Sequence, residues 1–353
     1  GAAQPAQVVA PVHRANLYVR DIEASLALYR DILKLQVVSD RAWDPRAHGL
    51  DTGVRMREVV LSAGNDRVGA LALYGIQGQR TPVRPMFQEP FGHTGDVATV
   101  WSTEDIWAIN DEVKAAGLVV LSPPVTLMIN PAMQVQSVEM QFRDPDGFLV
   151  NLLQVGIARD SPLAARIQGA QRSPEVMGTP ENTSTEAREP RFANPAKSEP
   201  VHPGFRIAPM NRTTTFGRDR DASLRFYRDT LGLSTLMSNY WKGVGINRIK
   251  NTRGLEQWAV ILMAGNSGNG NIGVYQLYGE KVDFPPPSRA AVPQTGDRGI
   301  SLFTNDIRRL HARYRAAGFQ VLAQPTNVPP TSTIEMMVRD PDGTIVTFIE
   351  APR

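Results

Sequence analysis

Residues 19–35 read VRDIEASLALYRDILKL, and residues 217–233 read GRDRDASLRFYRDTLGL. The two segments match at an offset of 198 residues. Blocks that recur in the same order over a whole chain indicate an internal duplication. The sequence therefore predicts two copies of one module. Three further blocks match in order: VVLSAGN at 59–65 with VILMAGN at 260–266, TGD at 94–96 with 295–297, and RDPDG at 143–147 with 339–343.

The duplication predicts four parts in this 353-residue chain. Residues 1–10 are expected to form a disordered tail, 11–156 the first module, and 205–353 the second module. Residues 157–204 lie between them, are rich in Pro, Ser, Thr and Glu, and lack apolar periodicity. Such a segment cannot bury enough apolar surface to fold alone, so we expect a proline-rich extended linker.

Each copy reads as two β-α-β-β-β units, which places the chain in the α+β class. The first strand leads into Asp21, a favourable helix N-cap, and Leu26, Tyr29 and Leu33 then follow at helical spacing. The last two strands of each copy flank Asp-Pro-Asp-Gly, because proline presets a turn and glycine accepts a positive φ. The motif predicts a hairpin at 144–147 and at 340–343.

The composition excludes several classes of protein. Apolar residues make up 42% of the chain and charged residues 21%, which is typical of a globular protein. The net charge of +3 is dispersed, so we expect no nucleic-acid partner. No apolar run approaches 18 residues, so we expect no membrane partner. The absence of cysteine excludes disulfides and thiolate sites.

The first residues, GAAQPAQ, are small and polar. They resemble the stub that remains after cleavage of a signal peptide. We therefore expect a periplasmic or secreted protein, with a cytoplasmic location as the open alternative.

The ordered motifs resemble the vicinal oxygen chelate superfamily, which includes glyoxalase I, bleomycin-resistance proteins and extradiol dioxygenases. The resemblance rests on the strand that ends in Asp, the S-L-x-x-Y-R-D-x-L-x-L helix, the later Ala-Ala-Gly helix end and the RDPDG turn. It covers both copies. It implies a tandem duplication of paired β-α-β-β-β units that form curled mixed-sheet cups. In active members the cup holds a divalent metal, ligated by His or Glu, which chelates two adjacent substrate oxygens.

This sequence departs from the family at the positions of the metal ligands. A guanidinium has no lone pair to offer a metal. We therefore expect metal-free cups and no cofactor, although a one-residue slip could bring His13 to the first position. The family positions hold Arg14, Ala72, Ala98 and Asn151 in the first copy, and Arg212, Gln276, Gly299 and Thr347 in the second.

Two pairs of charged residues recur in both copies and are the candidate catalytic residues. Arg14 and Arg212 either anchor a carboxylate, enolate or phosphate, or form structural salt bridges. Glu139 and Glu335 either pair with these arginines or act as general bases, or else face solvent at a sheet edge. Strand alternation places Arg14 with Asn16 and Tyr18 on one face.

Further residues are candidates for binding a ligand. Trp43 and Trp241 follow the first helix of each copy, and we expect them to form lids over an apolar or aromatic molecule. The complete set of predicted ligand-binding residues is Asn16, Tyr18, Trp43, Tyr74, Trp101, Asn151, Thr214, Trp241, Tyr278 and Thr347.

Three functions remain open. The first is a binding protein that holds a small aromatic or anionic organic molecule in a metal-free cup. The second is a metal-independent lyase or isomerase in which Arg14 or Arg212 stabilises an oxyanion. The third is a metal-dependent dioxygenase or glyoxalase with shifted ligands. The expected partner is a small-molecule ligand, and the chain is expected to be a monomer with pseudo-twofold modules or a homodimer.

Overall fold

The computed structural model describes residues 8–50, 53–78, 87–130, 135–158, 198–265, 267–279, 286–328 and 331–352. Residues 1–7 of the predicted tail and 159–197 of the predicted linker lie outside the described residues. The first strand begins at Val9, inside the predicted tail. Strand β8 (Leu149–Ala158) extends two residues beyond the predicted end of the first module, and the backbone N–H of Glu199 donates to Oδ1 of Asn269 in the second copy.

The first of two mixed eight-stranded sheets combines strands from both copies. Its order is β14-β15-β16-β13-β1-β4-β3-β2. The first copy supplies β1 (Val9–Val19), β2 (Gln36–Trp43), β3 (Arg55–Ser62) and β4 (Ala70–Gln77). The second copy supplies β13 (Arg298–Thr304), β14 (Val321–Val328), β15 (Thr333–Arg339) and β16 (Ile345–Glu350).

The second sheet combines the remaining strands in the order β10-β11-β12-β9-β5-β8-β7-β6. The first copy supplies β5 (Val97–Ser102), β6 (Val125–Asn130), β7 (Val135–Arg143) and β8 (Leu149–Ala158). The second copy supplies β9 (Arg212–Gly217), β10 (Ser234–Trp241), β11 (Glu256–Met263) and β12 (Asn271–Tyr278).

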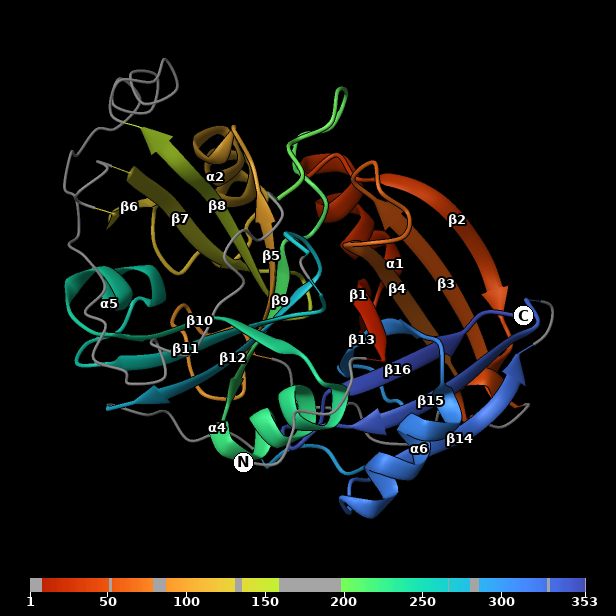
Figure 1. The fold of residues 1–353 in the computed structure, drawn as a ribbon. Helices are drawn as coiled ribbons and strands as arrows, with labels where there is room; N and C mark the ends of the chain where they lie inside the picture. The colour runs from red at the N-terminus through yellow and green to blue at the C-terminus, as the bar shows by residue number, and fades with distance from the viewer. Residues whose placement is uncertain are drawn as a thin grey trace.

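The two cups therefore do not coincide with the two copies. Figure 1 shows β1–β4 beside β13–β16, and β5–β8 beside β9–β12. The copies join through two antiparallel seams, β1 with β13 and β5 with β9. We call the face of the first sheet that carries Arg14 the first cup, and the face of the second sheet that carries Arg212 the second cup. The predicted class of curled α+β units is confirmed, and each cup contains one unit of each copy.

The helices Ile22–Leu26, Ile106–Ala115, Arg220–Leu224 and Ile307–Ala316 pack on the faces opposite the cups, whereas Val244–Lys250 lies on the cup side of the second sheet. Asp21 caps the first helix as predicted, since its carboxylate accepts hydrogen bonds from the backbone N–H groups of Glu23 and Ala24. Apolar residues from the helices join the strands in one large core. No helix among the described residues is long and apolar enough to cross a bilayer. The helical segments are α1 (Ile22–Leu26) with a π-helical turn (Ala27–Ile32), a 3₁₀ turn (Pro45–His48), α2 (Ile106–Ala115), α4 (Arg220–Leu224) with a π-helical turn (Arg225–Asp229), α5 (Val244–Lys250) and α6 (Ile307–Ala316).

The repeated RDPDG motif forms the predicted hairpin turns. The carboxylate of Asp144 accepts hydrogen bonds from the backbone N–H groups of Asp146 and Phe148, and Gly147 has a φ of 94°. The hydroxyl of Tyr29 donates to Asp144 over 2.8 Å. The same bond recurs in the second copy between Tyr227 and Asp340 over 2.6 Å. The tyrosine of the repeated helix therefore ties that helix to the hairpin.

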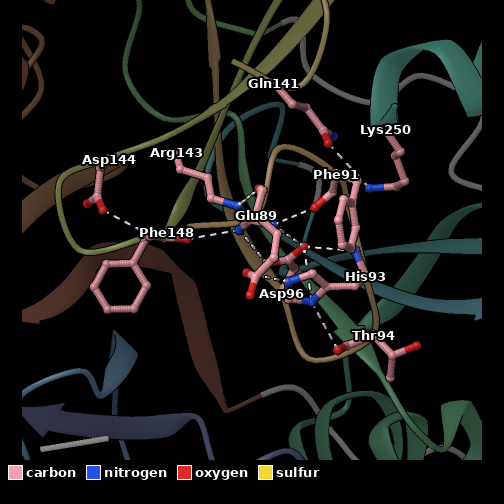
Figure 2. Close-up of polar contacts among 11 residues, drawn as sticks. Glu89, Phe91, His93, Thr94, Asp96, Gln141, Arg143, Asp144, Phe148 and Lys250 are labelled. Carbon is pink, nitrogen blue, oxygen red and sulfur yellow. Dashed lines mark hydrogen bonds and ion pairs between the residues drawn. The ribbon is translucent and has the colours of Figure 1, made fainter. Parts of the chain in front are cut away.

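The arginine of the same motif has a structural partner in the TGD motif. Arg143 is fully buried, and its two terminal nitrogens donate to Asp96 over 2.7 and 3.2 Å (Figure 2). In the second copy Arg339 donates to Asp297 over 3.2 and 3.1 Å. These paired bonds join each hairpin to the loop before β5 or β13. The most recognisable repeated motifs are thus structural, and none of them belongs to the catalytic candidates.

Candidate functional site

A cavity of about 750 Å³ occupies the second cup. Its floor comes from strands of both copies, because β9 pairs with β5 at the seam. Arg212 is opposite Val100 on β5 and Asn271 on β12, so these three side chains share one face. Val100 in turn is opposite Asn151 on β8. The register explains how residues far apart in the sequence reach one cavity.

Three charged groups of the cavity come from three different elements of the fold. Arg212 lies on β9, Glu139 on β7 and Lys250 at the end of α5. Burial raises the pKa of Glu139, and the positive charges of Arg212 and Lys250 act in the opposite direction. Glu139 of the first copy therefore lies in the electrostatic field of Arg212 from the second copy. Glu104 and Glu199 also line the cavity, so the site combines two cationic side chains with three carboxyl groups.

Lys250 is almost fully buried at the cavity wall. Its amine lies 3.4 Å from Oε1 of Gln141 and 3.5 Å from the centroid of the Phe216 ring (Figure 2 shows the contact with Gln141). Burial lowers the pKa of Lys250 to about 7, because a charged amine loses its hydration there. The charge of Arg143 lowers this pKa further, whereas the charges of Asp96 and Glu139 raise it.

Several buried polar atoms that line the cavity have no hydrogen-bond partner among the described residues. Proteins pair nearly all of their buried polar groups, since an unpaired one costs about 1–3 kcal/mol. A concentration of such atoms around one cavity is therefore a sign of a binding site. The atoms are Nε of Arg212, Oγ1 of Thr214, Oδ1 of Asn151, Nε2 of Gln154, Oε1 of Gln257, Oδ1 of Asn271 and Nε1 of Trp241.

The remaining wall of the cavity is apolar. Leu236 and Met237 from β10 and Ile246 from α5 line it, and Phe216 and Tyr275 meet edge to face with ring centroids 5.5 Å apart. Residues 198–201, at the end of the predicted linker, close one side of the cavity. The cavity thus offers polar groups on its floor and an apolar surface above them.

The first cup carries equivalent residues in a different arrangement. Tyr18 stacks on Tyr74 with ring centroids 5.0 Å apart, and its hydroxyl is 2.8 Å from Nδ1 of His48. The amide of Asn16 donates to the hydroxyl of Ser301 over 2.7 Å. His48 is buried, which lowers its pKa to about 4 and keeps the ring neutral at physiological pH.

The charges of the first cup form a second group. Nε of Arg41 donates to Glu58 over 3.1 Å, and the hydroxyl of Tyr74 donates to the same carboxylate over 2.9 Å. Burial and the charge of Glu58 raise the pKa of Glu335 to about 7, while Arg14 and Arg41 oppose this shift. Nε of Arg14 has no hydrogen-bond partner among the described residues. The charge of Arg14 therefore acts on Glu335 across the seam between the copies.

The structure brings most of the predicted ligand-binding residues to one of the two cups. The second cup receives Asn151, Thr214 and Trp241. Thr347 lies opposite Ser301 and so faces the first cup with Asn16. Trp43, whose ring lies 4.1 Å from the Arg41 guanidinium, belongs to the same cluster as Tyr18 and Tyr74.

Three predicted placements are corrected. Trp101 lies between Val100 and Ser102, which line the cavity, so its ring enters the large core on the opposite face and is fully buried there. Tyr278 does not line the second-cup cavity, and its ring contacts Tyr240 instead. Trp43 and Trp241 are the last residues of β2 and β10 rather than loop residues. Strand alternation explains the first error, since one residue of shift reverses the face.

Two functional candidates escaped the sequence analysis. Lys250 and His48 both come from the connection that follows Trp241 or Trp43. Neither lies in a repeated motif or a periodic segment. Their burial depends on contacts distant in sequence, such as the 2.7 Å hydrogen bond from Asn251 Nδ2 to the carbonyl of Pro90. No local signal would have revealed them.

The residues of the cups do not fit the metal that the superfamily implies. Glu104, Glu139 and Glu199 line the cavity of the second cup, and two cationic side chains act on Glu139. No cluster of three or more His, Asp or Glu side chains with metal-binding geometry occurs among the residues that the structure describes. His13 does not complete a site, because its Nδ1 contacts the carbonyl of Arg67 over 2.6 Å and its ring packs on Phe303. Cationic neighbours oppose the binding of a divalent ion.

Comparison with solved structures supports the fold. Glyoxalase I from Zea mays matches with a TM-score of 0.53 and 15% identity, over 96% of this chain and 92% of that chain. A putative dioxygenase from Bacillus subtilis subsp. subtilis str. 168 matches with a TM-score of 0.52 and 14% identity, over 99% of this chain and 87% of that chain. At these identities the likeness concerns the fold alone. No curated protein sequence matches the chain.

A family model matches both copies of this chain. The model of the Glyoxalase/Bleomycin resistance protein/Dioxygenase superfamily matches residues 11–152 and again residues 210–348. The two matched segments contain most of the chain and correspond to the two copies. The protein is thus a tandem member of the glyoxalase/bleomycin resistance protein/dioxygenase superfamily.

Proposed function

We propose that the second cup binds a small organic acid with an aromatic or apolar body. The unpaired polar atoms around the 750 Å³ cavity carry this proposal, because a ligand that satisfies them recovers their desolvation cost. The volume is within the usual range for sites of small molecules. The mixture of apolar wall and few polar groups is also typical of such sites.

Arg212 is the proposed anchor of the acid group. Its guanidinium lines the cavity and its Nε lacks a hydrogen-bond partner in the described structure. A guanidinium binds a carboxylate through two parallel hydrogen bonds. Trp241, Phe216 and Leu236 then provide the surface for the apolar body.

Calorimetric titration with benzoate tests this proposal. We expect saturable binding of benzoate and much weaker binding of benzamide, which has the same shape without the charge. Arg212→Ala is expected to weaken benzoate binding by roughly 10–100-fold, since a hydrogen bond to a charged group contributes about 1.5–3 kcal/mol. Arg14→Ala, the matched change in the first cup, is expected to leave the affinity within about twofold.

Two results would contradict the proposal. The first is the absence of saturable binding for benzoate, phenylacetate and phenylpyruvate alike. The second is an equal loss of affinity in the two arginine variants, which would show that the charge of the whole protein matters rather than the second cup.

A second candidate is a metal-independent lyase or isomerase at the same site. The observation that favours it is the raised pKa of Glu139 beside the Arg212 charge. A raised pKa makes the Glu139 carboxylate a stronger general base for removing a proton, while an arginine stabilises the resulting enolate oxygen. Accelerated exchange of the C3 hydrogens of phenylpyruvate in D₂O, lost in Glu139→Gln, would support this reaction. Exchange at the uncatalysed rate would exclude it for this compound.

A further inference from the structure

We propose that the amine of Lys250 forms a covalent imine with the carbonyl group of an oxo or formyl acid held in the second cup. This inference rests on the proposed function, because Arg212 is the anchor for the acid group of the same molecule. It concerns the class of ligand that the cavity accepts and the residue that reacts with it.

The backbone around Lys250 holds its side chain at the cavity wall. The N–H of Gly92 donates to the carbonyl of Lys250 over 2.7 Å, and the side-chain amide of Asn251 donates a hydrogen bond to the carbonyl of Pro90. A Cβ atom at Gly92 would lie 3.2 Å from three carbons of the lysine side chain, so only glycine leaves full room for it. The amine is therefore positioned by its surroundings rather than by a salt bridge.

The burial of the amine favours its neutral form, whereas its position over the face of the Phe216 ring is a cation–π contact that favours the ammonium. Its hydrogen-bond acceptor is the neutral amide of Gln141, and the ring of Phe216 covers it. Of the charged groups that act on it, Asp96 already accepts two hydrogen bonds from Arg143, and Glu139 is the remaining carboxyl group. The lowered pKa of Lys250 agrees with this environment. A neutral amine is the form that attacks carbonyl carbon.

The reaction needs no oxidant or metal. The nitrogen lone pair of Lys250 bonds to the carbonyl carbon, the C–O π pair moves to oxygen, and one N–H proton transfers to that oxygen. The carboxyl group of Glu139 protonates the resulting hydroxyl, which leaves as water. The nitrogen lone pair then completes the C=N bond and the remaining N–H proton returns to Glu139. The sum is amine plus carbonyl to imine plus one water.

Reductive trapping with 4-formylbenzoate tests the inference on the whole protein. This probe carries both an acid group and an aldehyde, and sodium cyanoborohydride converts any imine into a stable secondary amine. The chain has six lysines, so peptide mass mapping assigns the adduct directly. We expect one adduct per chain, on Lys250, with a rate that falls as pH decreases below about 7 because the amine becomes protonated.

Two variants complete the test. Lys250→Met is expected to abolish the adduct, and Lys242→Met, which changes an exposed lysine at the start of the same segment, is expected to leave its yield unchanged. If Lys250→Met does not fold, the mapped position in the wild-type protein decides the question. An adduct spread over several lysines would overturn the inference.

The failure of this inference is distinguishable from the failure of the proposed function. If 4-formylbenzoate displaces benzoate but leaves no adduct on Lys250, the anion site stands and the covalent step is wrong. If neither acid binds, the proposed function fails, and the inference fails with it.

Discussion

The two cups share a strand framework but differ in the side chains that project into it. In the first cup Tyr18, Tyr74 and His48 contact one another, and Glu58 accepts hydrogen bonds from Tyr74 and Arg41. At the positions of Tyr18 and Glu58 the second cup has Phe216 and Ala259, as the strand registers show. The second cup therefore has fewer hydrogen bonds between its own side chains, and several polar atoms that line it have no partner among the described residues.

The connections after β2 and β10 enlarge this difference. One places the neutral imidazole of His48 against Tyr18, and the other places the amine of Lys250 at the wall of a cavity. The strands are repeated, whereas these connections have diverged in sequence and conformation. The first cup also has unpaired polar atoms among the described residues, at Arg14 Nε and Asn16 Oδ1, but its tyrosine, histidine and glutamate side chains bond to one another. The second cup leaves more polar groups available to a ligand.

The largest expected effect comes from breaking the buried arginine–aspartate ion pair that both copies contain. Arg143→Met leaves Asp96 buried without its cationic partner, and breaking such a pair costs about 3–5 kcal/mol. We expect Arg339→Met to cost a similar amount, because Asp297 has the same role. Urea unfolding of both variants checks the prediction. A loss below about 1 kcal/mol in one variant alone would show that the two buried ion pairs are not equivalent, and such a small loss in both would contradict the predicted cost.

The next effect concerns the pH dependence of stability. The pKa of Lys250 is about 7 in the folded protein against 10.5 in the unfolded chain, so between these values the unfolded chain binds more protons. The free energy of unfolding should therefore rise with pH in this window, by up to about 1.4 kcal/mol per pH unit. Below pH 7 the amine is charged in the folded protein, and its burial then lowers the free energy of unfolding the most. Lys250→Met should remove this slope and be more stable than the wild type at pH 7.

Urea unfolding at pH 7 and pH 9 measures this slope. Lys242→Met serves as the control, because the changed lysine is exposed. If the wild type and Lys250→Met differ by the same free energy at both pH values, Lys250 is charged in the folded protein.

The smallest expected effect comes from a substitution that makes the first cup more like the second. Glu58→Ala introduces the residue that the second cup has at this position, and it removes the negative charge that raises the pKa of Glu335. We expect the pKa of Glu335 to fall from about 7 toward the ordinary glutamate value, as followed by carboxyl carbon NMR. An unchanged pKa would assign the shift to burial alone.

Local patterns were sufficient to predict several parts of this molecule. The duplication, the β-α-β-β-β units, the Asp21 cap and the DPDG hairpins each depend on residues close in the sequence. The inward direction of Arg14 and Arg212 followed from strand alternation. The same argument failed for Trp101, because it was assigned to a cup by residue type and not by its register.

The sequence by itself determined that two copies of a cup-forming module exist and that an arginine and a glutamate recur in each. Only the tertiary structure decided that Arg212 shares a cavity with Glu139 and that Arg14 acts on Glu335, because β1 pairs with β13 and β5 with β9 across the copies. It also decided that Lys250 is buried at a cavity and that His48 lies against Tyr18. Helix caps and turns depend on neighbouring residues, whereas strand partners and buried loop residues depend on contacts between distant segments.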